Sequence, residues 1–312
     1  MSNTVSYAQK FAQALDKVKI AGATSGWMEE NADNALYSGG NTVKLPKIST
    51  LSGLGNYSRS TGFATGSATF TYETETLSQE RGRKFFIDRV DVDETNFALT
   101  AENLLGEFTN REVNPELDAY RYSKIAKYVI DKDDSSLALY GKTLSLKQLL
   151  KDIAAVEDKI GEDTPLIVSI NRLVWEDINT DSNITKYVDI RDFTQGGITT
   201  KVKAIDNAII RPVPSARMKT TYTFKDGVTN TVGNNQTAGG FEAASSAKNI
   251  NWLITPAYAP RAVAKVQNVR IFEPGQNLDL DAYQIDYRLY HDLFISDNDV
   301  DNCLASIKES KS

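Results

Sequence analysis

Charged side chains crowd one stretch of the sequence that alternates like a β-strand. Acidic residues come first and basic residues follow: Glu73, Glu75, Glu80, Arg81, Arg83, Lys84 and Arg89. At a period of two residues, Phe70 and Tyr72 fall on one face of the strand, and Glu73 and Glu75 on the other. A strand this charged suits a protein core poorly. We therefore expect an arm that projects from the body and forms ion pairs with another surface.

Few residues in the chain could carry catalysis. His291 is the only histidine and Cys303 the only cysteine, so any nucleophile that needs a histidine base must use His291. His291 lies in an alternating segment, which favours an ordinary strand residue. Glu73 and Glu75 share one strand face, whereas a glycosidase places its two carboxylates across a cleft. The sequence predicts no catalytic residue, and a carboxylate-based hydrolase remains the less favoured alternative.

One acidic segment has the spacing of a calcium loop. Asp297, Asp299 and Asp301 stand at relative positions one, three and five, but position six is Asn302 instead of glycine and position twelve is Lys308 instead of glutamate. One histidine and one cysteine are too few for the usual zinc ligand sets. We therefore expect no metal site and no cofactor, and a solvated acidic turn at this segment.

Composition narrows the class of protein. The chain has 312 residues, 41% of them hydrophobic and 24% charged, with a net charge of -6. This length suits two medium domains, or one domain with extensions. Nucleic-acid binders usually carry a basic excess, which this chain lacks. No apolar run is long enough to span a membrane, and the first residues lack an apolar signal core, so we expect synthesis in the cytoplasm.

The charged stretch should be positioned by a hairpin and a long helix. Residues 41–93 alternate like strands, and the simplest arrangement is a long hairpin with Ala68–Val92 as its return strand. A helical pattern then runs from Ala98 to Val129. Pro115 lies inside this pattern, so we expect a kink there or two abutting helices.

The following part of the chain alternates between helices and strands. Ser145 and Gln148 match a capping box, and Gly161 suits the end of that helix. Residues 219–249 are rich in Thr, Gly, Asn and Ser and predict a long surface loop. The remaining predicted elements are strand Pro165–Ile170, helix Asn171–Ile178, strand Thr199–Arg211, strand Ile250–Thr255, and a final hairpin of Val269–Phe272 with Tyr283–Ile295.

Several of these segments resemble one known family. The stretches are 72–89 (YETETLSQERGRKFFIDR), 107–126 (EFTNREVNPELDAYRYSKIA), 210–218 (IRPVPSARM), 249–255 (NINWLIT), 269–274 (VRIFEP) and 287–294 (YRLYHDLF). Together they resemble the major capsid proteins of tailed bacteriophages that have the Hong Kong 97 (HK97)-like fold. The resemblance covers residues from about 41 to 296, and none of its motifs is catalytic.

The resemblance implies an α+β fold in four parts. These are an N-terminal arm (1–40), an extended β-hairpin loop over a neighbouring subunit (41–95), a peripheral domain with a long spine helix (96–140 plus 266–312), and a mixed α/β axial domain (141–265). The loop at 219–249 would approach the axis of a hexamer or pentamer. The seven charged residues named first would then lie at an interface between subunits.

The resemblance also implies a structural role without enzymatic activity. The chain would assemble with itself into hexamers and pentamers of an icosahedral or prolate shell, in the bacterial host cytoplasm, and end in the virion. The shell would enclose double-stranded DNA without sequence-specific binding and without contact to a membrane. Expected partners are a scaffolding protein, a portal and a decoration protein. An encapsulin-like compartment shell is the alternative. In either case, charge reversal at Arg81 and Arg83 should impair assembly more than folding.

Overall fold

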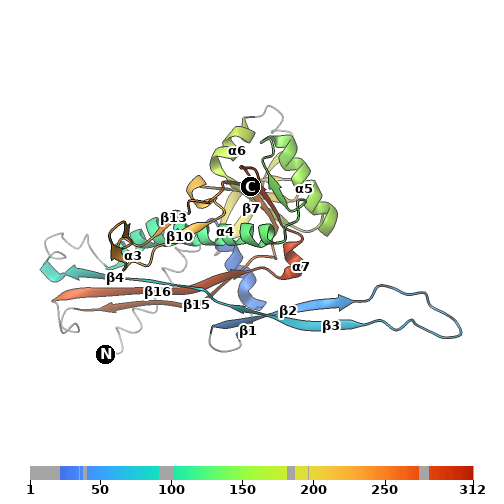
Figure 1. The fold of residues 1–312 in the computed structure, drawn as a ribbon, viewed down its shortest axis with the longest axis horizontal. Coiled ribbons are helices and arrows are strands. Elements are labelled where there is room, and N and C mark those ends of the chain that lie inside the picture. The colour runs from blue at the N-terminus through green and yellow to red at the C-terminus, as the bar shows by residue number, and fades with distance from the viewer. Residues whose placement is uncertain are drawn as a thin grey trace.

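The computed structural model describes residues 22–34, 36–37, 41–90, 101–180, 187–195, 197–273 and 281–311. Figure 1 shows three parts: an upper body around a large sheet, a long lower platform of strands beneath helix α4, and a hairpin that extends far beyond both. Most of the predicted N-terminal arm lies outside the described residues. Its last part forms the 3₁₀ helix η1 (Gly26–Asn34).

The upper body is built on a seven-stranded sheet with the strand order β5-β17-β14-β6-β9-β8-β7. The strands are β5 (Ala138–Tyr140), β17 (Leu304–Ile307), β14 (Ile250–Pro256), β6 (Leu166–Asn171), β9 (Ala208–Val213), β8 (Ile198–Ile205) and β7 (Val188–Gln195). The pairs β6–β9 and β17–β5 are parallel, and the others are antiparallel. Helices α5 (Leu146–Ile160) and α6 (Arg172–Asn179) bury their apolar faces against this sheet.

The local signals predicted helix α5 correctly. The side chain of Ser145 accepts a hydrogen bond from the backbone N–H of Gln148, which satisfies one of the free donors at the helix start. Gly161 ends the helix with a φ of 86°, a conformation that a side chain would disfavour. The side chain of Gln148 does not complete the capping box, because it donates to Asp152 instead.

Two predictions for this body need correction. The segment Thr199–Arg211 is not one strand: it turns at Asp206, whose φ is 50°, and forms β8 and β9 as an antiparallel pair. Strand β17 belongs to the seven-stranded sheet, although residues 266–312 were all assigned to the peripheral domain. Its partner β14 lies more than 45 residues earlier in the chain, and no local pattern reports such a pairing.

The lower platform is a three-stranded antiparallel sheet beneath a long helical rod. Its strands are β15 (Arg261–Phe272), β16 (Ala282–Phe294) and β4 (Gln79–Asp88), and the rod is α3 (Ala101–Phe108), the π-helical turn η2 (Thr109–Val113) and α4 (Asn114–Asp131). The predicted hairpin of residues 269–295 is confirmed as β15–β16. Buried side chains of both layers, including Leu105, Leu117 and Ile285, form the core between rod and sheet.

Pro115 interrupts the rod as predicted, in a particular form. It lies at the start of α4, directly after the π-helical turn Thr109–Val113. Proline has no backbone N–H, and its ring crowds the preceding turn. A single wide turn before the proline accommodates both constraints without ending the rod.

The predicted return strand Ala68–Val92 is wrong as one element. Strand β3 (Ala68–Thr76) pairs with β2 (Thr42–Leu51) in the projecting hairpin, whereas β4 pairs with β16 in the platform. The chain changes sheets at Leu77, which is buried among apolar side chains of both parts. The short strand β1 (Leu36–Tyr37) adds to the outer edge of β2.

The segment 219–249 carries small strands of its own. Strand β10 (Tyr222–Phe224) pairs with β13 (Phe241–Ala243), and β11 (Asn230–Thr231) pairs with β12 (Asn234–Asn235). The prediction put this segment in the axial domain, near a symmetry axis. In the structure it packs against the platform, where the Arg81 guanidinium donates to the backbone oxygens of Lys225 and Gly240 at 2.7 and 3.3 Å.

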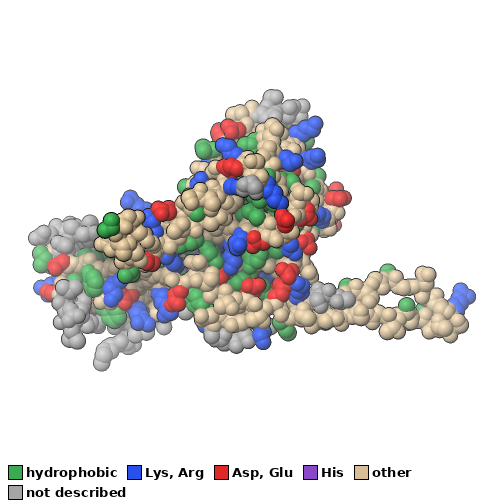
Figure 2. All heavy atoms as spheres, viewed as in Figure 1, with side chains coloured by type: hydrophobic (Ala, Val, Ile, Leu, Met, Phe, Trp, Pro, Cys, Tyr) green, Lys and Arg blue, Asp and Glu red, His purple; other side chains and the backbone are tan. Residues whose placement is uncertain are grey.

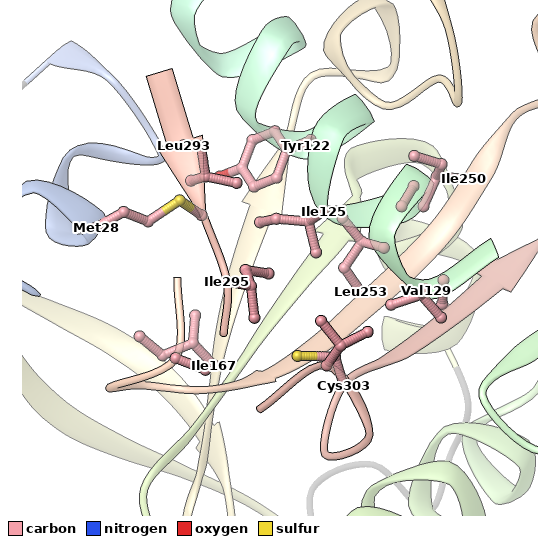
Figure 3. Packing of buried hydrophobic residues seen from close by; sticks show 14 of the residues in the cluster. Met28, Tyr122, Ile125, Val129, Ile167, Ile250, Leu253, Leu293, Ile295 and Cys303 are labelled. Atoms are coloured by element: carbon pink, nitrogen blue, oxygen red, sulfur yellow. The ribbon is translucent and has the colours of Figure 1, made fainter. Parts of the chain in front are cut away.

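Helix α4 joins the two sheets through a shared core. Its residues Tyr122, Ile125 and Val129 pack against Leu253 of β14 and Ile295 at the end of the platform strand β16, as Figure 3 shows. The thiol of Cys303 is buried in the same cluster. The upper body and the platform are therefore one packed unit.

The end of the N-terminal arm is held on this unit by a buried carboxylate. Asp118 of α4 is fully buried and accepts hydrogen bonds from the backbone and hydroxyl groups of Thr24 and Ser25, and from Arg217 at 2.8 Å. A buried charge needs such partners to offset its lost hydration. These contacts fasten residues 24 and 25 to α4.

Candidate assembly surface

The seven charged residues of the predicted interface lie on two different strands. Glu73 and Glu75 lie on β3, at the base of the projecting hairpin. Glu80, Arg81, Arg83 and Lys84 lie on β4 of the platform, and Arg89 follows directly after it. The structure does not bring the two groups together on one face, because the chain changes sheets between them.

Glu73 holds the base of the hairpin to the body. Lys47 of β2 lies 2.6 Å from Glu73 and 2.9 Å from Asp297, so one ammonium group joins both hairpin strands to the acidic segment after β16. Both partners favour the charged form of the lysine and raise the pKa of Lys47. Glu73 therefore has a partner within its own chain.

Arg81 is the most thoroughly bonded of the seven. Its guanidinium forms two hydrogen bonds with Glu116 of α4, at 2.6 and 3.2 Å, in addition to the two carbonyls of the segment 219–249. This fork geometry matches arginine and carboxylate well. Arg81 thus joins the platform, the helical rod and the segment 219–249 inside a single subunit.

These contacts give Arg81 a role in folding beside the predicted role in assembly, which stays a prediction. We expect Arg81→Glu to lower the free energy of unfolding of the monomer by about 2 to 4 kcal/mol, because it places a carboxylate against Glu116 and removes two donors. Lys84→Glu, which changes the charge equally on the same strand, should cost less than about 1 kcal/mol. Urea unfolding of both variants measures the difference. Equal stability of the two would contradict a role for Arg81 in the fold.

The other members of the set are also engaged inside the chain. Glu80 forms an ion pair with Arg288 on the neighbouring strand β16. Arg83 donates to the backbone oxygen of Thr237 at 3.2 Å. The ammonium of Lys84 lies 5.7 Å from the centre of the Phe86 ring, and Arg89 lies 3.7 Å from Asp281. Exposed pairs of this kind contribute about 0 to 1 kcal/mol each, so they remain available for rearrangement at an interface.

Glu75 titrates abnormally, and this has a measurable consequence. Partial burial raises the pKa of its carboxyl above the ordinary value, and Lys124 opposes part of this effect. A raised pKa means that the folded state binds the proton more tightly, so stability falls as the pH rises from about 4. We expect Glu75→Gln to raise the melting temperature by about 1 to 2 °C at pH 7 and to leave it unchanged at pH 4. Glu112→Gln, at an exposed position, is the control, and an equal shift at both pH values would refute the explanation.

A group of exposed apolar side chains lies outside the seven charged residues that the sequence predicted for the interface. The outer part of the hairpin, residues 51–72, carries one charged side chain, Arg59. Large apolar side chains along it face solvent: Leu51, Leu54, Tyr57, Phe63, Phe70 and Tyr72. Phe63 is 87% exposed and Phe70 75% exposed. We call residues 51–72 the arm tip.

The shape of the arm tip adds to this argument. Figures 1 and 2 show it as a thin hairpin that extends beyond the rest of the molecule. Exposed apolar patches on soluble proteins commonly mark interaction sites. In the sequence, this surface is marked by the scarcity of charged residues among the aromatic residues of 51–72. The charged run lies directly beside it.

A buried carboxylate in β16 also holds the projecting hairpin to the body. Asp292 of β16 is 1% exposed and accepts hydrogen bonds from the backbone and hydroxyl of Ser78 at 2.9 Å each, and from the hydroxyl of Tyr120 at 2.6 Å. Lys124 of α4 completes the group as an ion-pair partner. Ser78 lies directly at the change of sheets, so Asp292 sets the direction in which the arm leaves the body.

The residues considered for catalysis or metal binding occupy structural positions. His291 is buried in β16, with its ring edge-on to that of Tyr120 at 5.4 Å. Asp297, Asp299 and Asp301 each face a different cation, namely Lys47, Arg261 and Lys132. Within the described part of the chain, no three potential ligands converge on a metal position. No helix there combines the length and apolarity needed to cross a bilayer.

Comparisons with known proteins give one clear result. No protein-family model matches the chain, and no curated protein does. Solved structures do match. The capsid structure of cyanophage P-SCSP1u aligns with a TM-score of 0.52 and 12% identity, over 88% of this chain and 85% of that one. A structure from Mycobacterium phage Bobi aligns with a TM-score of 0.52 and 13% identity, over 91% of both chains.

This chain has the fold of the tailed-phage capsid proteins. The HK97-like fold predicted from the sequence is therefore confirmed, as a mixed α and β structure. The same fold occurs in the SrpI encapsulin of Synechococcus elongatus, which aligns with a TM-score of 0.52 and 8% identity over 88% of this chain and 84% of that one. At these identities, the likeness establishes the fold.

Proposed function

We propose that this protein is the major capsid protein of a tailed bacteriophage. Copies of the chain assemble into hexamers and pentamers of a closed shell that encloses double-stranded DNA. The observation that carries the proposal is the combination of the HK97-like capsid fold with an arm tip whose large apolar side chains are mostly exposed to solvent in the described part of the chain. The protein acts through contacts with its own copies and turns over no substrate.

The arm tip supplies the contact between subunits in this proposal. It lies over the body of a neighbouring copy, where its apolar side chains become buried. Burial of apolar surface contributes about 25 cal/mol per Å², so a few large aromatic side chains outweigh the exposed ion pairs of the seven charged residues. The charged residues then adjust the register between subunits, while the arm tip supplies most of the binding energy.

The proposal keeps three of the four parts expected from the sequence, with revised boundaries. We assign the arm tip and strands β2 and β3 to the extended loop, the platform with the helical rod to the peripheral domain, and the seven-stranded sheet to the axial domain. A scaffolding protein, a portal and a decoration protein remain the expected partners. The shell would assemble in the cytoplasm of the bacterial host and become part of the virion.

An encapsulin-like compartment is the second candidate, because the encapsulin structure matches as well as the phage capsids do. Electron microscopy of the purified protein, alone and with the expected scaffolding protein, tests the proposal. Closed shells are expected, and a protein that stays monomeric at high concentration under both conditions would refute it. Shells that enclose a cargo enzyme in place of DNA would favour the second candidate.

A further inference from the structure

Six lysines lie around the end of the seven-stranded sheet where β5, β17 and β14 meet. We call them the lysine patch: Lys142, Lys147, Lys151, Lys219, Lys248 and Lys308. The backbone N–H of Gly141 donates to the oxygen of Ile307 at 3.0 Å, which places Lys142 next to Lys308. None of these lysines was part of the predicted interface.

Asn249 connects three members of the patch. Its backbone oxygen accepts from the N–H of Lys308 at 2.9 Å, and its side-chain oxygen accepts from the ammonium of Lys219 at 2.9 Å. Lys248 is its neighbour in sequence, and the Lys248 ammonium lies 5.2 Å from the centre of the Tyr140 ring. Lys219, Lys248 and Lys308 therefore approach one another from three separate segments.

Helix α5 carries Lys147 and Lys151 and packs against β14, where the Asp152 carboxylate accepts a hydrogen bond from the indole N–H of Trp252 at 3.0 Å. Lys147 and Lys151 are four residues apart and share one face of the helix. Lys142 and Lys151 are both close enough to the partly buried carboxyl of Asp152 to lower its pKa, against the larger rise that burial causes. Lys142 thus links the helix side of the patch to the strand side.

A hollow lies beside Lys219 and Lys308. It has a volume of about 410 Å³, and Asn171, Asn249 and Asn251 line it along with the two lysines. The amide groups of Asn249 and Asn251 each donate one hydrogen bond within the chain, to Glu309 and Ser306. Lysine ammonium groups and amide N–H groups are common donors to phosphate oxygens. Some apolar side chains also border the hollow, and Asp177 is the carboxylate among its described lining residues.

The patch has a surplus of positive charge in a chain whose net charge is negative. Among the described residues, three carboxylates adjoin the six lysines: Asp152, Asp177 and Glu309. Asp152 is largely buried within α5 and bonded to Trp252, and Glu309 accepts two hydrogen bonds from Asn249. Lysines therefore outnumber carboxylates two to one here, whereas the chain as a whole has a net charge of -6.

We propose that the lysine patch binds the phosphate backbone of double-stranded DNA without reading its sequence. Contacts from lysines to phosphates release counterions and give affinity that does not depend on the bases. The proposed function adds a direction: in a shell that encloses DNA, the patch faces inward. That second part rests on the proposed function, whereas phosphate binding by the patch does not.

The test compares two triple variants with the same change in charge. The patch variant is Lys142→Gln, Lys151→Gln, Lys308→Gln, and the control is Lys127→Gln, Lys201→Gln, Lys265→Gln, all at exposed positions. Fluorescence anisotropy of a labelled DNA duplex with the unassembled full-length chain is measured between about 50 and 200 mM salt. For the patch variant we expect affinity at least about tenfold lower and a salt slope lower by about 2 to 3. The control should bind like the wild type.

Equal affinity and slope for the two variants would overturn the proposal. A competition experiment gives a second result that would overturn it. If polyglutamate displaces the labelled DNA at a lower concentration, counted in negative charges, than an unlabelled duplex does, the partner is an acidic protein. Electron microscopy of the same variants is read separately. If the chain forms no shell but binds DNA through the patch, the proposed function is refuted and phosphate binding stands. If shells form but DNA binding does not depend on the patch, phosphate binding is refuted and the proposed function stands.

Discussion

Replacing the apolar side chains of the arm tip should abolish shell formation and leave the monomer folded. The variant is Leu54→Ser, Tyr57→Ser, Phe63→Ser. These side chains face solvent in the isolated chain, so their loss should change the free energy of unfolding by less than about 1 kcal/mol. In a shell, each would be lost from a buried contact at a cost of about 1.5 to 3 kcal/mol per residue. Particle yield by electron microscopy and the monomer melting temperature measure the two effects.

The matched control lies in another exposed part of the same chain. Val228 and Val232 are exposed apolar residues of the segment 219–249, and Val228→Ser with Val232→Ser should leave the particle yield within about twofold of the wild type, as surface substitutions outside a contact do. Loss of particles in both variants would point to a general effect of surface polarity. Normal particles in the arm-tip variant would remove the arm tip from the interface.

Removing the charge of Asp292 should destabilise the protein more than any other substitution considered for the arm. Asp292→Asn keeps the shape of the side chain but removes the ion-pair partner of Lys124 and turns an acceptor into a donor. Loss of one partner from a buried ion pair typically costs about 3 to 5 kcal/mol. Because Lys124 is partly exposed, we expect a loss of about 3 kcal/mol in urea unfolding.

Strand β16 also supplies the control for this prediction. Asp286 lies on the same strand, where its carboxylate accepts from Gln284 in a less buried setting. Asp286→Asn should cost less than about 1 kcal/mol. If the two variants unfold at the same urea concentration, Asp292 does not hold the junction. If Asp292→Asn leaves the stability unchanged but lowers the yield of shells, the carboxylate sets only the direction of the projecting hairpin and does not stabilise the fold.

In these two predictions, the base of the projecting hairpin contributes to folding and its tip contributes to assembly. At its base, Asp292 and the Lys47–Glu73 pair use buried or bonded charges to fix the arm to the body. At its tip, large apolar side chains are mostly exposed to solvent. Under the proposed function, we expect a subunit of this design to be stable by itself and to associate through its arm tip.

Local patterns in the sequence were sufficient for several elements. Helix α5 begins after Ser145 and ends at Gly161, because a cap and a glycine stop act within one turn of the helix. The hairpin β15–β16 followed from alternation and from the turn region Gly275–Asp281, since consecutive antiparallel strands can be joined by a single short connection. The stretches that resemble capsid proteins predicted the fold that the solved structures then confirmed.

The role of the charged run was decided by the tertiary structure. Arg81 bonds to Glu116 and to the segment 219–249, and strand β4 pairs with β16, with Gln79 opposite His291. These partners lie far apart in the chain, and alternation of charge does not say which strand will pair. The run therefore looked like one free strand, although burial of Leu77 divides it between two sheets.

The sequence by itself determined helix α5, the hairpin β15–β16 and the class of fold, because each depends on contacts between near neighbours or on stretches that resemble a known family. Which surface was left uncovered depended on the packing of distant segments. Long-range pairing gave the charged residues partners inside the subunit and left the aromatic arm tip exposed. The resemblance implied that residues 41–95 lie over a neighbouring subunit, but the exposure of individual side chains is a property of the whole fold, and so only the structure singled out the apolar arm tip as the proposed assembly surface.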